Sequence, residues 1–356
     1  MRRWRLAGSL AAGRSSVIDW LKLRLLINAA GKVPGDKVMI ITPDGEVKWE
    51  KIRALEVTGS YDANVHVSVC PIKGTLVIDG NPAKFFQGHN VFGTDDIHGL
   101  AKAIALHAIG RLPDLNVQEH DLANIHEGII ELSRVDLTGM YSVGTKMHAT
   151  AAVRAMGERA TMRHRGRGNI SREGTAYFGK NSRRSAIKVY AKGVELKDHK
   201  LHRQLPYADD IIAYAQDKLR IEVVLRAMEL KDRGLDVLAN WQQDTAALLY
   251  AEFLGKLNVP DNIELDPPSI EALKPRLRLA YDSWMRGTDL RVALPRMTFY
   301  RYRAELLEHG IDILTVRPSL PQSNVLPLVR ILEARPAAVP EWAHGTPVYF
   351  EPSRVA

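Results

Sequence analysis

Four segments with strand-like alternation place chemically useful polar side chains two residues apart. Residues i and i+2 of a β-strand share one face of a sheet, so each segment would present its polar groups together. Each segment alone is typical of an amphipathic strand with one wet face, but together they supply a nucleophile, acids and cations. In chain order the groups are Gln87 with His89; Arg134 with Asp136 and Thr138; Lys188 with Tyr190 and Lys192; and Arg220 with Glu222.

The tyrosine of the third segment is a candidate nucleophile. Lys188 and Lys192 stand two residues to either side of Tyr190, and neighbouring cations stabilise a phenolate. Arg134 and Arg220 suit phosphate binding, because a guanidinium donates paired hydrogen bonds to phosphate oxygens. These residue types indicate chemistry at a phosphate ester.

The same segments contain the donor atoms of a divalent cation site. His89 offers an imidazole, Asp136 and Glu222 offer carboxylates, and Gln87 offers a side-chain carbonyl. Hard cations prefer oxygen ligands with some imidazole. These four residues are therefore the expected metal ligands.

A basic stretch precedes the tyrosine segment. From Arg154 to Arg184 the chain carries far more Lys and Arg than Glu. Its part Arg163–Gly168 has the glycine content of a mobile loop, and a solvated charge run is one interpretation of the whole stretch. Because the stretch interrupts a folded region beside the candidate nucleophile, we favour contacts with a phosphate backbone. The expected DNA contacts there are Arg163, Arg165, Arg167, Arg183 and Arg184, in addition to Arg134 and Arg220.

Composition narrows the class of protein. The chain has 356 residues, 46% hydrophobic and 25% charged, which is typical of one or two globular domains. The single cysteine, Cys70, excludes an intramolecular disulfide and a cysteine-rich zinc module and favours a reducing compartment. Lys and Arg exceed Asp and Glu by 49 − 41 = 8, which favours a polyanionic partner. No apolar run approaches the ~20 residues that span a bilayer, so we expect no membrane partner.

The elements that would position these groups indicate an α+β fold, an antiparallel sheet with helices packed against it. Alternation and turn residues predict strands at Val17–Leu26, Val38–Thr42, Val47–Trp49, Asn64–Val69 and Gly74–Asp79, with a hairpin turn at Asp44–Gly45. Helical spacing predicts helices over Asp96–Arg111, Met147–Ala160 and Ala208–Gln216.

The C-terminal part has a different character. The proline-rich stretch 258–268 predicts a linker, and helical patterns beyond it, including Thr298–Gly310, predict a smaller, mainly helical domain. We therefore expect a catalytic domain over 17–257, a linker over 258–268 and a C-terminal DNA-binding or interaction domain over 269–356.

Several motifs together resemble one known family, the replication initiators of filamentous bacteriophages, or gene II type proteins. The most specific is the stretch 81–96, which reads NPAKFFQGHNVFGTDD. The resemblance extends from Ile18 to Trp342. Further matching segments follow in the family's order, namely Ser133–Asp136, Tyr190–Leu196, Leu219–Glu222, Pro295–Tyr302 and Asn324–Arg330.

The resemblance implies an enzyme that nicks one strand of duplex DNA at the phage origin and later rejoins the displaced strand. It places the family's catalytic tyrosine on Tyr190, which would attack phosphorus to form a 5′-phosphotyrosine and release a 3′-hydroxyl for rolling-circle synthesis. Lys188 or Lys192 would lower the pKa of this tyrosine or hold the phosphate.

The resemblance also implies a divalent cofactor and partners. Mg²⁺ or Mn²⁺, held by His89 with Asp136 or Glu222, would polarise the scissile phosphate. The family is grouped with the HUH endonucleases, which carry two histidines, whereas this chain has Gln87 in one of those positions. The implied partners are supercoiled and single-stranded origin DNA, with host helicase and polymerase, in the host bacterial cytoplasm.

A non-catalytic DNA-binding regulator of phage replication is the alternative. The helix expected at Met297–Gly310 carries Tyr300, Arg301 and Arg303 near its start, as a recognition helix does. Packing of Leu306 and Leu307 into a core explains the same pattern. An enzyme forms an SDS-stable, metal-dependent adduct with origin DNA, whereas a regulator only retards it on a gel.

Residues 1–16 show no periodic pattern and carry arginines without any acid. A basic arm on DNA is one interpretation. Relatives typically start Met-Ile-Asp, and here Val17 precedes Ile18-Asp19. Since a valine codon, GTG, can start translation in bacteria, we expect residues 1–16 to be a dispensable extension that packs against nothing.

Overall fold

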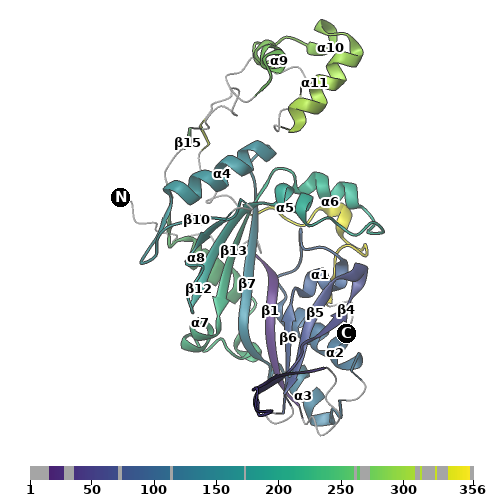
Figure 1. Cartoon of the computed structure of the whole chain (residues 1–356), viewed down its shortest axis with the longest axis vertical. Coiled ribbons are helices and arrows are strands. Elements are labelled where there is room, and N and C mark those ends of the chain that lie inside the picture. Colours follow the sequence, from purple (N-terminus) through teal and green to yellow (C-terminus); the bar gives the residue numbers. More distant parts are fainter. Residues whose placement is uncertain are drawn as a thin grey trace.

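The computed structural model of the chain (Figure 1) describes residues 16–27, 36–70, 74–112, 115–171, 174–259, 263–264, 273–308, 313–314, 325–326 and 336–352. Within them the centre is a nine-stranded sheet in which every neighbouring pair is antiparallel. In spatial order its strands are β10 (Asn169–Ile170), β11 (Ala176–Phe178), β12 (Ser185–Ala191), β13 (Lys218–Arg226), β7 (Glu131–Ser142), β1 (Val17–Leu26), β6 (Thr75–Gly80), β5 (Asn64–Cys70) and β4 (Leu55–Thr58).

Helices and short hairpins surround this sheet. The helices are α1 (Pro82–Gln87), α2 (Ile97–Gly110), α3 (Glu119–Glu127), α4 (Lys146–Arg159), α5 (Lys192–Asp198), α6 (Ala208–Ala215), α7 (Ala227–Asp232), α8 (Thr245–Leu254), α9 (Pro275–Met285), α10 (Leu290–Ala293) and α11 (Arg296–Glu308). The remaining strands are β2 (Lys37–Ile41) with β3 (Val47–Ile52), β8 (Thr161–Met162) with β9 (Gly166–Arg167) and β14 (Leu257–Asn258), and β15 (Ile263–Glu264) with β16 (Val325–Leu326). The α+β class expected from the sequence is confirmed.

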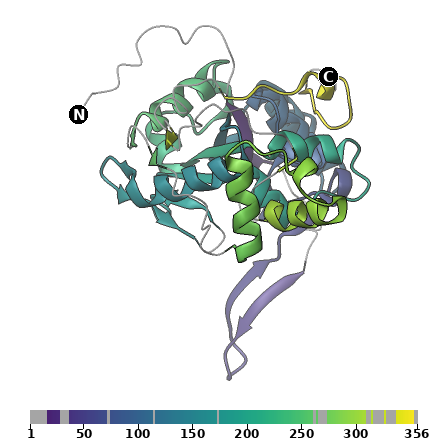
Figure 2. The same cartoon turned by 90° about the horizontal axis from the view of Figure 1, so that it is seen from above.

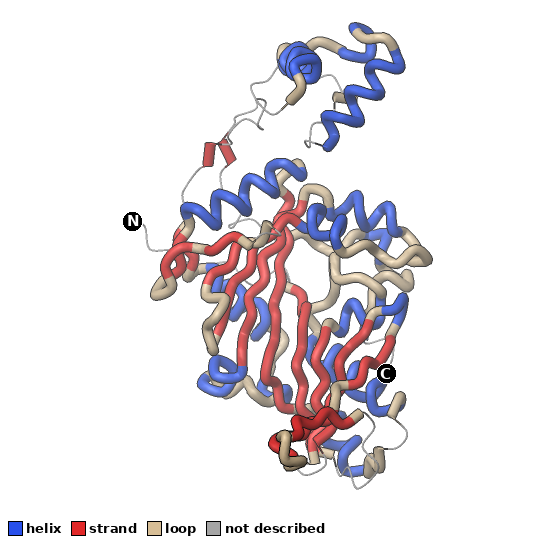
Figure 3. Tube along the Cα trace, viewed as in Figure 1, coloured by secondary structure: helices blue, strands red, loops and turns tan. Residues whose placement is uncertain are grey.

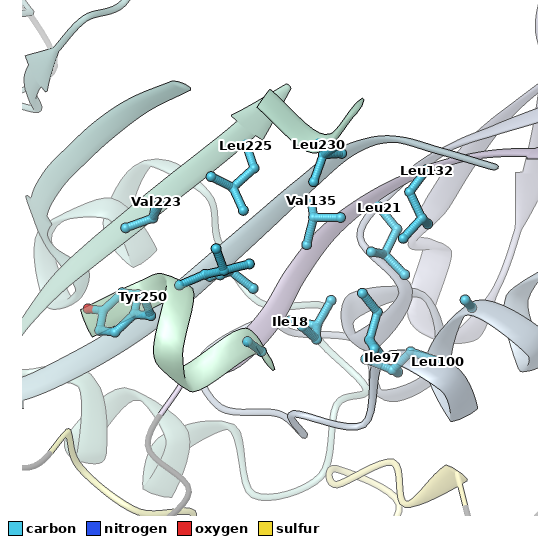
Figure 4. Packing of buried hydrophobic residues seen from close by; sticks show 14 of the residues in the cluster. Ile18, Leu21, Ile97, Leu100, Leu132, Val135, Val223, Leu225, Leu230 and Tyr250 are labelled. Carbon is cyan, nitrogen blue, oxygen red and sulfur yellow. The ribbon is translucent and has the colours of Figure 1, made fainter. Parts of the chain in front are cut away.

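One face of the sheet is apolar and forms the main core (Figure 4). Val135 of β7 and Val223 and Leu225 of β13 point into it, because alternate residues of a strand share a face. Helices α2 and α8 cover this face and contribute Leu100 and Tyr250 to the same cluster. Burial of this much aliphatic surface is the main favourable contribution to folding.

The opposite face carries the polar side chains and is covered at one end by a second, smaller cluster. Met140 of β7, Leu196 of α5, Ile211 of α6 and Phe92 after α1 belong to it, together with Val348 near the end of the chain. The segment 336–352 (yellow in Figure 1) is therefore packed on the sheet body beside the loop that follows α1.

A β-bulge in β1 brings two consecutive residues to the polar face. Ile18 pairs with Leu137 and Trp20 pairs with Asp136, which leaves Asp19 as the extra residue between them. A bulge of this kind re-aims one side chain without breaking the strand. As a result Ile18 packs into the core, while Asp19 and Trp20 both lie on the polar side. There Asp19 accepts a hydrogen bond from Arg220, and Trp20 donates one to Asp79.

Most of the expected elements are present, but one of the four polar segments is not a strand. The residues Phe85–Asn90 belong to α1 and the turn that follows it. The helix forms because Asn81 accepts a hydrogen bond from Lys84 N at 2.7 Å and Pro82 occupies the first turn. Gly88, at φ +81°, ends it in the left-handed conformation that favours glycine.

Two hairpins differ in their placement. The hairpin of β2 and β3 turns at Asp44–Gly45 as expected and projects away from the body (purple, bottom of Figure 2). The Gly-rich part of the basic stretch, expected to be a mobile loop, is instead a tight hairpin of β8 and β9, which β14 extends.

A separate group of helices lies beyond the sheet body (Figure 3). Leu277 and Tyr281 of α9, Leu290 of α10, and Phe299 and Leu306 of α11 form their own core. The expected C-terminal range 269–356 thus contains two parts, because the segment 336–352 packs on the sheet body rather than on these helices.

The expected N-terminal extension 1–16 and the expected linker 258–268 lie mostly outside the described residues. Residues 1–15 lie outside them, whereas Ser16 lies within them and is buried. Most of the expected linker 258–268 also lies outside; the described pair β15 and β16 joins it to residues 325–326. Among the described residues no helix is long and apolar enough to cross a membrane.

Candidate active site

The register of the sheet brings three of the four predicted polar segments side by side. In β12 and β13, Lys188 lies opposite Glu222 and Tyr190 lies opposite Arg220. In β13 and β7, Glu222 lies opposite Thr138. The predicted polar side chains of these three neighbouring strands stand at even-numbered positions and therefore form one polar surface on the same face of the sheet.

Tyr190 lies at the centre of this surface and donates a hydrogen bond from its hydroxyl to Glu222 Oε1. Burial raises the pKa of Tyr190 well above its usual value; Arg220 opposes this and the charge of Glu222 adds to it. Burial alone would raise the pKa of Glu222, but the charges of Lys188 and Arg220 lower it to about 2. The pair is thus a neutral phenol that is hydrogen-bonded to an ionised carboxylate.

Lys188 links two carboxylates. Its Nζ lies 2.9 Å from Glu222 Oε2 and 3.6 Å from Asp136 Oδ2. Arg134 holds Asp136 with two hydrogen bonds, from Nε at 2.8 Å and from Nη2 at 2.6 Å. The two carboxylates are nearly fully buried, whereas Lys188 and Arg134 are 24% and 31% exposed, so the cations are the groups that an approaching phosphate meets first.

Arg220 is an internal cation. Its side chain is fully buried and donates to Asp19 Oδ1 at 2.6 Å, to Glu222 Oε1 at 3.1 Å and to the carbonyl oxygen of Asn90. All three partners are protein atoms, so Arg220 orients the carboxylates in place of the expected contact with DNA. Asp19 also accepts from Asn81 and Asn90.

Lys192 is also internal. It is the first residue of α5, its side chain is fully buried, and its Nζ lies 2.8 Å from Asn90 Oδ1 and 2.7 Å from Glu195 Oε2. Burial and the charge of Arg220 lower its pKa, while Glu195 opposes the shift. Lys192 therefore holds Asn90 in place and is too deeply buried to bind a phosphate in this conformation.

Gln87 and His89 occupy the turn after α1 and bond to main-chain atoms. Gln87 donates from Nε2 to Phe92 O at 2.7 Å and to His89 O at 3.1 Å, and its Oε1 accepts from Phe350 N at 2.9 Å. His89 Nδ1 accepts from Val91 N at 3.1 Å, so Nε2 donates to Val348 O at 2.8 Å. Burial lowers the pKa of His89 to about 4, opposed by the bond to Val348 and aided by Lys192 and Arg220.

The expected metal ligands do not form one site. The polar atoms of Gln87 and His89 are all used within the protein, and the charged neighbours of His89 are cations. Asp136 and Glu222 share Lys188 as their common cation. In the described part of the chain no three His, Cys, Asp or Glu side chains are grouped so that they could hold a metal ion.

The arginines expected to contact DNA fall into two groups. Arg163 and Arg167 are exposed on the β8–β9 hairpin, and Arg183 is exposed before β12. The others make internal contacts: Arg165 donates to Ser185 O at 2.6 Å, and Arg184 pairs with Glu229 and Asp232.

The helix expected at Met297–Gly310 corresponds to α11. Tyr300 is half exposed and Arg301 is exposed, whereas Arg303 is partly buried and makes contacts within the protein. Leu306 is fully buried in the core of α9–α11. The helix therefore has both a packed side and an exposed side with aromatic and basic residues.

Three residues around Tyr190 were not singled out from the sequence. Asp19, Asn81 and Asn90 form the far side of the network through Arg220 and Lys192. Asn81 and Asn90 stand within the most specific motif, 81–96, and Asp19 stands where the family resemblance of the chain begins, so all three lie in segments that resemble the family. Their polar character carried no alternation that could have marked them.

Comparisons with known proteins give matches over most of the chain. One family model, which describes the N-terminal part of a phage replication-associated protein of the gene II type, matches residues 17–244. A second model, for the C-terminal part of the same protein, matches residues 272–353. The replication-associated protein of Enterobacteria phage I2-2 is 35% identical over 336 residues, covering 91% of this chain and 95% of that protein.

Two more distant similarities cover less of the chain. The replication-associated protein of Enterobacteria phage M13 is 24% identical over 307 residues, covering 72% of this chain and 73% of that protein. A solved structure of a rolling circle replication initiator protein from Geobacillus stearothermophilus covers 75% of this chain and 94% of its own, at 13% identity. Its TM-score of 0.31 is too low to establish a common fold.

Proposed function

The chain belongs to the family of the gene II type replication-associated proteins, and from this premise we propose that it initiates rolling-circle replication by nicking and rejoining one strand of phage origin DNA. The observation that carries the proposal is the hydrogen bond from the Tyr190 hydroxyl to an ionised Glu222. A phenol is a poor nucleophile until a base removes its proton. Glu222 is already in contact with this phenol, and it becomes a stronger base once Lys188 turns to the phosphate, because the charge of Lys188 contributes most to the low pKa of this carboxyl.

The nicking step follows from these two side chains. Tyr190 Oη attacks the phosphorus of a phosphodiester, and its proton passes to Glu222. The bond from phosphorus to the 3′-oxygen breaks, and this oxygen leaves with the electron pair and takes up a proton from solvent. The product is a 5′-phosphotyrosine and a free 3′-hydroxyl.

Rejoining is the same step in reverse. A 3′-hydroxyl attacks the phosphotyrosine and gives up its proton to solvent, and Glu222 returns a proton to the departing phenolate. One phosphodiester is exchanged for another ester of phosphate, so resealing needs no ATP. Lys188 and Arg134 are the partly exposed cations of this surface. They would bind the phosphate oxygens in the way that they now bind the carboxylate oxygens of Glu222 and Asp136.

The divalent ion that the family resemblance predicts, Mg²⁺ or Mn²⁺, is a separate part of the proposal. Such an ion neutralises charge on the phosphate. The polar atoms of Gln87 and His89 are bonded to main-chain atoms and are not available to bind a metal ion. The proposed nicking step therefore uses Tyr190, Glu222 and Lys188 alone.

Adduct mapping tests the proposal. Supercoiled origin DNA incubated with the protein should give a nicked circle and an SDS-stable adduct, and proteolysis should locate the nucleotide on Tyr190. Tyr190→Phe should bind the same DNA without forming the adduct. Adduct formation by this variant would remove Tyr190 from the nucleophile's role.

The partners follow from the product of the nick. A 3′-hydroxyl is a primer for a DNA polymerase, and continued synthesis requires a helicase to displace the old strand. We propose host enzymes of these two kinds as partners, and the host bacterial cytoplasm as the place of the reaction.

The DNA substrate must also be open at the cleavage site. Because the phosphate must reach Tyr190 within the sheet body, the strand to be cut must be locally single-stranded.

A non-catalytic regulator remains the second candidate because of α11. Exposed Arg301 and half-exposed Tyr300 lie on a helix of a separate small core, as in a helix that reads DNA. Retardation of origin DNA without any covalent adduct under all ionic conditions would favour this function over nicking.

A further inference from the structure

The last described segment of the chain, residues 336–352, lies against residues 88–92 after α1, which we call the active-site loop. We propose that this segment is a positioning segment for the nicking reaction. We call it the C-terminal strap. The inference rests on the proposed function and assigns to the strap the task of holding Asn90, and through Asn90 the cations around Tyr190, in place.

The strap bonds to two residues that come just before Asn90 in the chain. Its Phe350 N donates to Gln87 Oε1 at 2.9 Å, and its Val348 O accepts from His89 Nε2 at 2.8 Å. Gln87 in turn closes the loop by donating to Phe92 O. Because Gln87 and His89 are removed from bulk water, losing either bond leaves a buried polar group unsatisfied.

Aromatic contacts hold the strap on the sheet body. Phe350 stacks on Phe86 of α1 with ring centroids 4.1 Å apart, and Trp342 stacks on Tyr207 at 5.6 Å. Trp342 also meets the ring of Phe92 edge-on at 5.8 Å. These rings come from both sides of the active-site loop, so they fix the direction of the strap as well as its position.

Two hydrogen bonds to backbone atoms of the strap tie its start to the other side of the site. Ala337 N donates to Met140 O of β7 at 2.6 Å, and Tyr214 of α6 donates to Ala338 O at 2.8 Å. The strap therefore bridges β7, α6 and α1, three elements that are far apart in the sequence.

The path from the strap to Tyr190 is short. Asn90 follows His89 directly; its side-chain oxygen accepts from Lys192, and its main-chain oxygen accepts from Arg220. Arg220 donates to Glu222, which accepts from Tyr190. A displaced strap would release His89 and Asn90, and Glu222 would lose the orientation that it needs to take the proton.

Phe350→Ala in the full chain tests the strap. The loss of one stacked ring should lower kcat for nicking of an origin oligonucleotide about threefold to tenfold, with KM unchanged, because a positioning segment acts on the chemical step and not on the binding of DNA. Phe350→Tyr keeps the stacked ring and should restore kcat. Trp342→Ala, at a more exposed position, should lower kcat in the same direction and is the milder change if Phe350→Ala fails to fold.

The controls separate this inference from the proposed function. Leu248→Ala removes an exposed apolar side chain on α8, on the opposite face of the sheet, and should leave kcat unchanged. If the wild-type protein does not nick, the proposed function fails. If it nicks while folded Phe350→Ala and Trp342→Ala both keep the wild-type kcat, the strap is not a positioning segment. A rise in KM with unchanged kcat also overturns the inference, because it would mean that the strap binds the DNA.

Discussion

Two neighbouring regions of the molecule bury polar side chains in opposite ways. Around Tyr190 the side chains bond to one another, as in the contacts of Glu222 with Lys188 and Arg220. In the turn after α1, Gln87 and His89 bond to main-chain atoms. The first region can exchange its ionic partners for a phosphate, whereas the second cannot exchange a main chain, so the first is suited to react and the second to hold.

Electrostatics separate the regions in the same way. Burial keeps His89 neutral by lowering its pKa to about 4, whereas the charges of Lys188 and Arg220 keep Glu222 ionised against the effect of burial. Buried charge persists only where opposite charge is at hand. A reactive site is thus distinguished from a scaffold by its partners and not by how deeply its polar groups are buried.

The largest expected effect comes from removing the nucleophile of the reactive region. Tyr190→Phe should lower nicking by at least about 10³-fold, because the attacking oxygen is lost, while DNA binding and the melting temperature stay close to wild type. Quantified nicked circles and gel retardation measure the two properties. If nicking persists, Tyr177 of β11 becomes the next candidate, since it lies opposite Lys188 in the neighbouring strand.

Glu222→Gln should come next in size. The amide keeps the shape but cannot accept the proton of Tyr190, so kcat should fall on the order of 10²-fold, with little change in KM. Glu131→Gln is a suitable control, because Glu131 lies in β7 but pairs with Arg24 at the exposed surface. An unchanged kcat in Glu222→Gln would place the base elsewhere and remove the main contrast between the two regions.

The holding region should also affect the pH dependence of stability, through His89. The folded protein binds no proton at His89 until the pH falls to about 4, whereas the unfolded chain binds one from about pH 6.5 downward. The stability linked to this residue is therefore fully present above pH 6.5 and is lost as the pH falls toward 4, by about 1.4 kcal/mol per unit.

Denaturant unfolding at pH 7 and pH 5 measures this effect. Wild type should lose about 2 kcal/mol between these values, and His89→Gln should lose clearly less because it has no titrating group. His66→Gln, at an exposed position in β5, should keep the wild-type loss. Equal pH dependence in all three proteins would contradict the scaffold role of His89.

The smallest effect is expected outside both regions, on the basic hairpin. Changing Arg163, Arg165 and Arg167 together to Gln should flatten the dependence of log K for DNA on log salt by about 0.7 to 0.9 for each lost phosphate contact. Because Arg165 is bonded to Ser185 O, we expect Arg163 and Arg167 to account for the change. An unchanged slope would mean that these arginines are solvated and make no contact with DNA phosphates.

The sequence alone led to the family through the resemblance of its motifs, and its alternation and turn residues led to the α+β class and to the face shared by Lys188 and Tyr190. The family is confirmed by the models that match residues 17–244 and 272–353. The shared face followed from alternation within each strand, which is a local property. The start of α2 was also local, since Asp96 caps it through Gly99 N.

Which polar groups touch one another depended on the folded arrangement of the elements. Alternation predicts a face but not which strand lies next to which, so the contact of Glu222 with Lys188 and Tyr190 required the register of β12 and β13. The bulge in β1 and the capped helix α1, in place of an expected strand, changed the partners of Arg220 and His89. The return of residues 336–352 to the sheet body was outside the reach of sequence pattern, because it depends on contacts between residues more than 200 positions apart, such as that of His89 with residue 348.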